Sequence, residues 1–263
     1  MNTPHVLVTG DYGHRDFVDL VLHARFPITL CPLACLDQQE RSDTGLALVV
    51  IAQSRRGQFA SIAVEEIVDR YPGIPVICLC GSWCEGELRS GQPVCGVLRV
   101  YWHQWQGRLE SFLEQLQRVG VTAWHLPRIC SEADRIISEI RPNASINHEI
   151  SLGISSPTLG EYQMLQDACR QFSANAVWIA GGALPEKNVP RLDALLAVAN
   201  SWDDQLASRI VALQKTFATV PIAAIVNFPR QRDVAAARRV GVAELISKPF
   251  QLKDVQHSLK RML

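Results

Sequence analysis

Short apolar runs alternate with amphipathic segments along the whole chain. An apolar run bounded by turn residues is typical of a strand buried in a parallel sheet, and apolar residues three or four positions apart indicate a helix. In the first half this pattern predicts strands at residues 5–10, 27–31, 46–52, 75–80 and 97–101. Helices are predicted at residues 16–24, 61–71 and 108–116. The order of these elements predicts a doubly wound sheet in which a loop replaces one helix.

The second half repeats this order. Strands are predicted at residues 150–154, 174–181, 192–199, 222–226 and 243–246, and helices at residues 158–172, 201–217, 233–239 and 251–263. Asn200 or Ser201 is expected to cap the helix that ends at Phe217, and Gly241 suits the left-handed position after a helix. We therefore predict an α/β chain with two doubly wound parallel-sheet domains in tandem, residues 1–120 and 147–263. Residues 121–146 are predicted to form a linker with a short helix that begins at Ser131.

The charge balance and the apolar runs argue against several classes of partner. The 263 residues carry 26 Lys and Arg against 26 Asp and Glu, so the formal net charge is zero. A nucleic-acid-binding domain needs a basic surface, which this balance does not favour. The N-terminus lacks the basic and apolar regions of a signal peptide, and no apolar run approaches the ~18 residues of a membrane span. We expect a cytoplasmic protein that binds neither nucleic acid nor membrane.

Residues 221–250 carry the most specific pattern in the chain. An apolar strand, a polar turn, an Ala-rich helix and Gly241 precede a second apolar strand, which ends in the sequence SKPF at residues 247–250. This stretch resembles the C-terminal half of a response-regulator receiver domain, whose fifth strand ends in a Lys-Pro pair. Val226 precedes Lys248 by 22 residues, the separation expected between the family's Ser or Thr and its Lys. The resemblance implies a flavodoxin-like, receiver-like fold for each domain and a role in signal transduction.

A working receiver holds Mg²⁺ with an acidic pair after its first strand and accepts a phosphoryl group on an aspartate after its third strand. A Ser or Thr after the fourth strand and a Lys after the fifth complete the set, and cation and ammonium offset the phosphoryl charge. In the second half these positions match, in this order, Ser155 and Ser156, Val198, Val226 and Lys248. Only the lysine of that set remains, followed by Pro249. Since no carboxylate stands at a matched position, we expect Lys248 to reach solvent or a backbone carbonyl.

The first half keeps a single acid of the set, Asp11, which follows Gly10. Its third strand ends without an aspartate, Cys80 lies at the Ser/Thr position, and Trp102 or His103 lies at the lysine position. One carboxylate cannot both hold Mg²⁺ and act as the nucleophile. We therefore expect neither half to be phosphorylated, and we predict no catalytic residue, no metal site and no cofactor.

Two further motifs are weaker. The glycines of residues 8–13 (VTGDYG) resemble a dinucleotide-binding turn, but the charge of Asp16, at the third glycine position, would oppose a phosphate. The cysteines are spaced C-x3-C and C-x-C rather than as two C-x-x-C pairs, so they do not predict a zinc site.

An unusual aromatic and acidic group is expected at the carboxyl edge of the first sheet, where open α/β folds bind ligands. It comprises Trp83, Glu85, Glu87, Trp102, His103 and Trp105. One interpretation is a surface for a partner or a ligand, since aromatic side chains contribute strongly to interfaces. The other is that the rings fill the space left by a lost phosphorylation pocket. Both interpretations stay open.

The main hypothesis is a non-enzymatic signalling or regulatory protein, a phosphorylation-independent pair of pseudo-receiver domains that acts through contacts with other proteins. The resemblance implies partners such as a histidine kinase or a regulator, docked through the fourth helix, fifth strand and fifth helix. A homodimer is a further candidate. The alternative is a small-molecule- or nucleotide-binding protein, or an enzyme, that uses the carboxyl edge of the first sheet.

Overall fold

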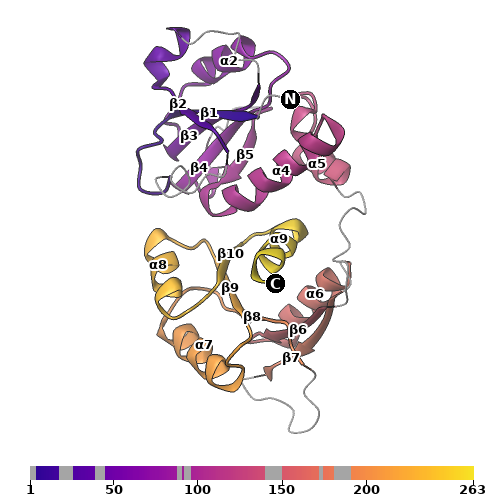
Figure 1. Cartoon of the computed structure of the whole chain (residues 1–263). Helices are drawn as coiled ribbons and strands as arrows, with labels where there is room; N and C mark the ends of the chain where they lie inside the picture. The colour runs from indigo at the N-terminus through magenta and orange to yellow at the C-terminus, as the bar shows by residue number, and fades with distance from the viewer. Residues whose placement is uncertain are drawn as a thin grey trace. The chain divides into compact units, whose positions relative to one another are not determined.

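The computed structural model describes residues 4–17, 26–38, 45–87, 91, 96–139, 150–171, 174–180 and 191–263. The chain divides into two compact units, Met1–Arg141 and Pro142–Leu263 (Figure 1). Each unit contains a five-stranded sheet in which every pair of neighbouring strands is parallel. The predicted fold class, two doubly wound parallel sheets in tandem, is confirmed.

The first unit has the strand order β2-β1-β3-β4-β5. Its strands are β1 (His5–Gly10), β2 (Ile28–Leu30), β3 (Leu46–Arg55), β4 (Val76–Trp83) and β5 (Leu98–Tyr101). Its α-helices are α2 (Ser61–Arg70), α4 (Trp105–Val119) and α5 (Glu132–Glu139), and its 3-10 helices are η1 (Leu33–Gln38), η2 (Trp102–Gln104) and η3 (Ala123–His125). The helix predicted at residues 16–24 lies, apart from its first two residues, outside the described part of the chain.

The two central strands of this unit are longer than predicted. The sequence places their ends at Ala52 and Cys80, whereas the ladder continues to a pairing of Arg55 with Trp83, after a register shift that follows Gln53. Apart from Trp83, the added residues are polar or glycine, so a continuous apolar run gives no sign of them. Cys80, matched to the Ser/Thr at a strand end, consequently lies inside β4.

Apolar side chains on both faces of the first sheet make its core. The central residues of β3 are fully buried, as expected for a strand in the middle of a parallel sheet. After α4, the Trp124 ring of η3 stacks on Phe112 of α4 with 4.6 Å between ring centroids. Arg135 of α5 donates a hydrogen bond to the carbonyl oxygen of Ala123. Helix α5 lies within the segment predicted as a linker and packs on η3, whose Trp124 in turn stacks on α4.

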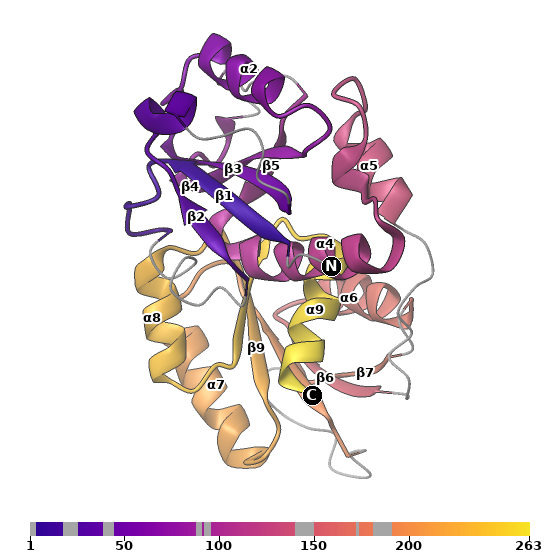
Figure 2. The same ribbon diagram turned by 45° about the horizontal axis from the view of Figure 1, so that its top comes forward.

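The second unit has the order β10-β9-β8-β6-β7, the same topology counted from its own first strand. Its strands are β6 (Ile150–Ser155), β7 (Ala174–Trp178), β8 (Ala194–Val198), β9 (Ile222–Asn227) and β10 (Glu244–Lys248). Its helices are α6 (Leu159–Arg170), α7 (Asp204–Thr216), α8 (Gln231–Arg239) and α9 (Leu252–Met262). Helices α6 and α9 pack on one face of the sheet and α7 and α8 on the other (Figure 2).

Two predictions about helix ends in this unit, the N-cap before Phe217's helix and the left-handed Gly241, can be compared with the structure. The N-cap of α7 is Asp203, whose carboxylate accepts a hydrogen bond from the Leu206 amide at 2.8 Å. The prediction of Asn200 or Ser201 as the cap was wrong, because both residues belong to the turn that leaves β8. After α8, Gly241 has a φ of +80°, which confirms the predicted left-handed position.

Candidate functional site

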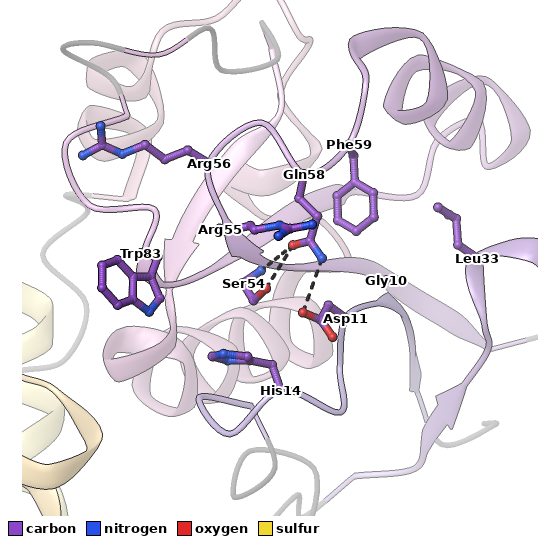
Figure 3. A pocket seen from close by; sticks show the side chains of 10 residues that line it. All are labelled: Gly10, Asp11, His14, Leu33, Ser54, Arg55, Arg56, Gln58, Phe59 and Trp83. Carbon is purple, nitrogen blue, oxygen red and sulfur yellow. Dashed lines mark hydrogen bonds between the residues drawn. The ribbon is translucent and has the colours of Figure 1, made fainter.

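An open cleft of about 1030 Å³ lies at the carboxyl ends of β1, β3 and β4 in the first unit (Figure 3). It is lined by Gly10, Asp11, His14, Leu33, Ser54, Arg55, Arg56, Gln58, Phe59 and Trp83. Strands β1 and β3 are neighbours, but the chain leaves β1 toward β2 and leaves β3 toward β4. This reversal is the topological switch point at which open α/β sheets bind ligands.

Gly10 gives the cleft its backbone floor. Its φ is +87°, a conformation that side-chain-bearing residues rarely adopt. A Cβ at this position would lie 2.6 Å from the Ala52 carbonyl oxygen and 3.0 Å from Cζ of Phe59. The absence of a side chain at residue 10 thus lets the Phe59 ring approach the end of β1.

Asp11 is held by a neutral amide. The Gln58 Nε2 group donates a hydrogen bond to Asp11 Oδ2 at 3.3 Å, and Gln58 Oε1 accepts one from the Ser54 amide at 2.8 Å (Figure 3). The Ser54 hydroxyl donates a second hydrogen bond to the same oxygen, at 3.2 Å. Among the described residues, no three His, Cys, Asp or Glu side chains lie close enough together to hold a metal ion. Asp11, the one acid kept from the receiver set, is therefore a hydrogen-bond acceptor in the wall of the cleft.

Two arginines and an exposed indole also line the cleft. Arg55 and Arg56 follow one another at the end of β3, and Figure 3 shows the side chains of both among those that line the cleft. Arg56 donates a hydrogen bond to the carbonyl oxygen of Glu85. The Trp83 side chain stands on another wall, and 62% of the residue is exposed. The cleft thus combines a net positive charge with an accessible aromatic surface.

Glu87 does not present its carboxylate at this edge. Only 2% of the residue is exposed, and its carboxylate forms an ion pair with Arg99 of β5. It also accepts hydrogen bonds from the Gly57 amide at 3.0 Å and from Gln53 Nε2 at 3.3 Å. A buried carboxylate needs such partners because burial removes its hydration. Glu87 therefore supports the turn after β3 from inside the fold.

The predicted aromatic group is divided by the fold. Trp102 and Trp105 are buried, and the His103 ring stacks on Tyr101 with 5.8 Å between centroids. Burial lowers the pKa of His103 to about 3, since the charged imidazolium loses its hydration. None of these three lines the cleft, whereas Trp83 does. The interpretation that the rings fill space therefore fits Trp102, His103 and Trp105. Of this group, only Trp83 is placed where it could contact a ligand in the cleft.

In the second unit, Lys248 has a carboxylate partner. Its Nζ lies 2.8 Å from Oε1 of Glu161, which belongs to the first turn of α6. The expectation that Lys248 would find no carboxylate was wrong, because the helix after β6 brings an acid to the same edge. The Lys248–Pro249 peptide bond is cis.

The residue matched to the receiver's nucleophile, Val198, is also contacted by a cationic side chain of the same unit. Arg209 of α7 donates a hydrogen bond to the carbonyl oxygen of Val198, at the end of β8. Burial lowers the pKa of Arg209, while the negative charges of Asp203 and Glu161 oppose this shift. Ser155, at an expected acidic position, is buried, and its hydroxyl has no hydrogen-bond partner in the described part of the chain. Among the described residues, Lys248 and Arg209 therefore bring two cations to the carboxyl edge of this sheet, where Glu161 and Asp203 supply negative charge.

Sequence reasoning missed several residues of both sites. Arg55 and Arg56 gave a usable signal, since two adjacent cations stand three and four residues after the apolar run that ends at Ala52. Glu161 gave none, because it is 87 residues from Lys248 in the chain. Gln58 and Phe59 lie in a loop and match no motif.

None of the described helices combines the length and the apolar character that a membrane span requires.

No family model and no curated protein matches the chain. Similar solved structures include the chemotaxis protein CheY4 of Vibrio cholerae, with 17% identity and a TM-score of 0.39 over 44% of this chain and 100% of that chain. The pilus assembly protein CpaE of Caulobacter crescentus CB15 has 13% identity and a TM-score of 0.35 over 42% of this chain and 91% of that chain. A two-component system response regulator/GGDEF domain protein has 14% identity and a TM-score of 0.38 over 98% of this chain and 99% of that chain.

At these identities and TM-scores the matches carry no conclusion about function, and the fold of each unit is established by its strand order. By that strand order and by its Lys248-Pro249 ending, the chain is a tandem of two receiver-like α/β units.

Proposed function

We propose that the chain is a non-enzymatic signalling protein whose two receiver-like units act through contacts with other proteins, without being phosphorylated. The observation that carries this proposal is the ion pair of Lys248 with Glu161, with Nζ and Oε1 2.8 Å apart. The resemblance to receiver domains implies that the lysine at this position of a working receiver binds the phosphoryl group.

An internal carboxylate replaces the phosphoryl group as the partner of the lysine. Glu161 supplies negative charge beside Lys248, and the aliphatic Val198 stands where a nucleophilic carboxylate would be needed. Phosphoryl transfer requires that nucleophile and a cation to offset charge on the phosphoryl oxygens. In the first unit β3 ends in Gln53, Ser54 and Arg55, which supply no carboxylate either.

The surface for partners follows from the resemblance. Receivers dock through the fourth helix, fifth strand and fifth helix, which correspond to α8, β10 and α9 here. Basic residues end both helices, Arg238 and Arg239 on α8 and Lys260 and Arg261 on α9. A partner such as a histidine kinase or a regulator, or a second copy of the chain, would meet this surface.

Intact-mass measurement tests the central claim. The full chain is incubated with Mg²⁺ and acetyl phosphate, alongside a working receiver domain as the positive control. We expect the control to gain the mass of one phosphoryl group and this chain to keep its own mass. A stoichiometric phosphoryl adduct on the chain would refute the proposal.

A further inference from the structure

We infer that the cleft of the first unit binds a small molecule that carries a planar ring and an anionic group. This inference is independent of the proposed function, because it concerns noncovalent binding in the other unit. A nucleoside 5′-monophosphate has the required chemistry, and so does an aromatic carboxylate.

The position and size of the cleft suit such a ligand. It lies at the switch point between β1 and β3, and its volume of about 1030 Å³ is at the upper end of the range for small-molecule sites. Gly10 keeps its floor free of a side chain, so a ligand can approach the backbone at the end of β1. A receiver would place its acids and its cation here, but this cleft is lined by one carboxylate, Asp11, and by the guanidinium groups of Arg55 and Arg56.

The anionic group is assigned to Arg55. Arg55 lines the cleft and lies at its exposed side (Figure 3). Within the described part of the chain, no carboxylate or carbonyl accepts a hydrogen bond from its guanidinium group. A planar guanidinium can donate two parallel hydrogen bonds to a carboxylate or phosphate. Arg56 adds a second positive charge at the same strand end, so the two arginines outweigh the single charge of Asp11.

The ring is assigned to the apolar side of the cleft. Trp83 offers an exposed indole face, and Phe59 and Leu33 line the cleft as well. Stacking of a planar ring on an aromatic side chain is favourable for every nucleobase and for other aromatic rings. The exposed indole can stack on the planar ring of a ligand while a guanidinium group of the same cleft binds its anionic group.

Asp11 selects among planar anions. Gln58 fixes one of its carboxylate oxygens, so the carboxylate is held in place as an acceptor for a ligand hydroxyl or amine. The same negative charge opposes a bare phosphate ion. A ligand with a ring, an anion and a hydrogen-bond donor therefore binds better than any of these parts alone.

Titration of the full chain tests the inference, with binding followed by ligand-observed NMR and by tryptophan fluorescence. The probes are 5′-AMP and 4-hydroxybenzoate, and adenosine and ribose 5-phosphate are the part-ligands. We expect at least one whole probe to bind with a Kd below about 1 mM and both part-ligands to bind at least about tenfold more weakly. The probe that binds shows whether the ligand of the cleft is a nucleotide or an aromatic carboxylate.

Two variants locate the site. Arg55→Ala and Trp83→Ala should each weaken the bound probe about tenfold, because each removes one of the two assigned contacts. Arg118→Ala, an exposed arginine near the end of α4, is the matched control and should leave binding unchanged. Thermal unfolding confirms that each variant is folded. The inference is overturned if neither probe binds saturably, or if both cleft variants bind like the control.

Discussion

Oε1 of Glu161 lies 2.8 Å from Nζ of Lys248, which ties the first turn of α6 to the end of β10. The two side chains are 24% and 18% exposed, so the pair is screened less than a surface ion pair. Glu161→Gln and Lys248→Met should each destabilise the protein by about 1 kcal/mol, with a coupling energy of about 0.5–1 kcal/mol in a double-mutant cycle. Urea unfolding of the four proteins measures both.

The pair Arg170–Asp167 is the matched control, on the same helix. Its side chains are 63% and 71% exposed, although the two atoms lie 3.0 Å apart. Its coupling energy should be about 0.3 kcal/mol, as for other exposed pairs on a helix. Equal coupling energies in the two cycles would contradict the role given to Glu161.

Much of the fold could be predicted from the sequence, because apolar runs such as Leu46–Ala52 and Leu192–Ala199 are what a buried parallel strand requires. The extension of β3 to Arg55 could not be predicted. Gln53 and Ser54 are buried polar residues, and their burial depends on partners such as Glu87 and Gln58, which are distant from them in the sequence or lie in a loop.

The candidate site could be predicted only in part. Asp11 and Trp83 follow from the rule that strand ends carry functional side chains. The rule failed for Trp102, His103 and Trp105, since the chain turns into η2 and α4 at that point and buries the rings. The partner of Lys248 could not be found, because a contact between elements far apart in the sequence leaves no local pattern.

The second prediction concerns the buried ion pair of Glu87 with Arg99. Glu87→Gln should destabilise the protein by about 3 kcal/mol, because it leaves the Arg99 charge buried without its counter-charge. Glu114→Gln, at an exposed position on α4, should change stability by less than about 0.5 kcal/mol. Chemical denaturation gives both values, and a Glu87 variant as stable as the Glu114 variant would show that the pair contributes little.

The third prediction compares two glycines of one turn. Gly10→Ala should cost about 2–4 kcal/mol, because the φ of +87° is strained for alanine and the new Cβ would meet the Ala52 carbonyl oxygen at 2.6 Å. Gly13→Ala introduces a Cβ with no atom within 4 Å and should change stability by less than about 1 kcal/mol. Thermal unfolding of both variants measures this difference in stability. Similar melting temperatures would show that the close approach of Ala52 to residue 10 does not restrict the side chain there.

The fourth prediction follows from the pKa of His103, which burial lowers to about 3. In the unfolded chain this histidine gains a proton near pH 6.5, so between pH 6.5 and 3 the unfolded state binds more protons than the folded state. Stability should therefore fall as the pH falls through this range, by about 1 kcal/mol per pH unit from this residue.

Replacing the histidine tests this pH dependence. His103→Phe keeps a ring against Tyr101 and removes the titrating group, so its stability should fall less steeply between pH 6.5 and 4 than that of the wild-type protein. His5→Gln serves as the control for losing a histidine elsewhere in the first unit. Parallel slopes for the wild-type and His103→Phe proteins would assign the acid sensitivity to other groups.

The contact between Glu161 and Lys248 forms as soon as the second unit folds, since both partners are encoded in the chain. A phosphoryl group is attached and removed by chemical reactions, which gives a modified receiver a lifetime. A carboxylate of the same polypeptide has no such lifetime. Under the proposed function, the rates at which cells make and degrade the chain would set the strength of its signal, and no phosphatase could switch it off.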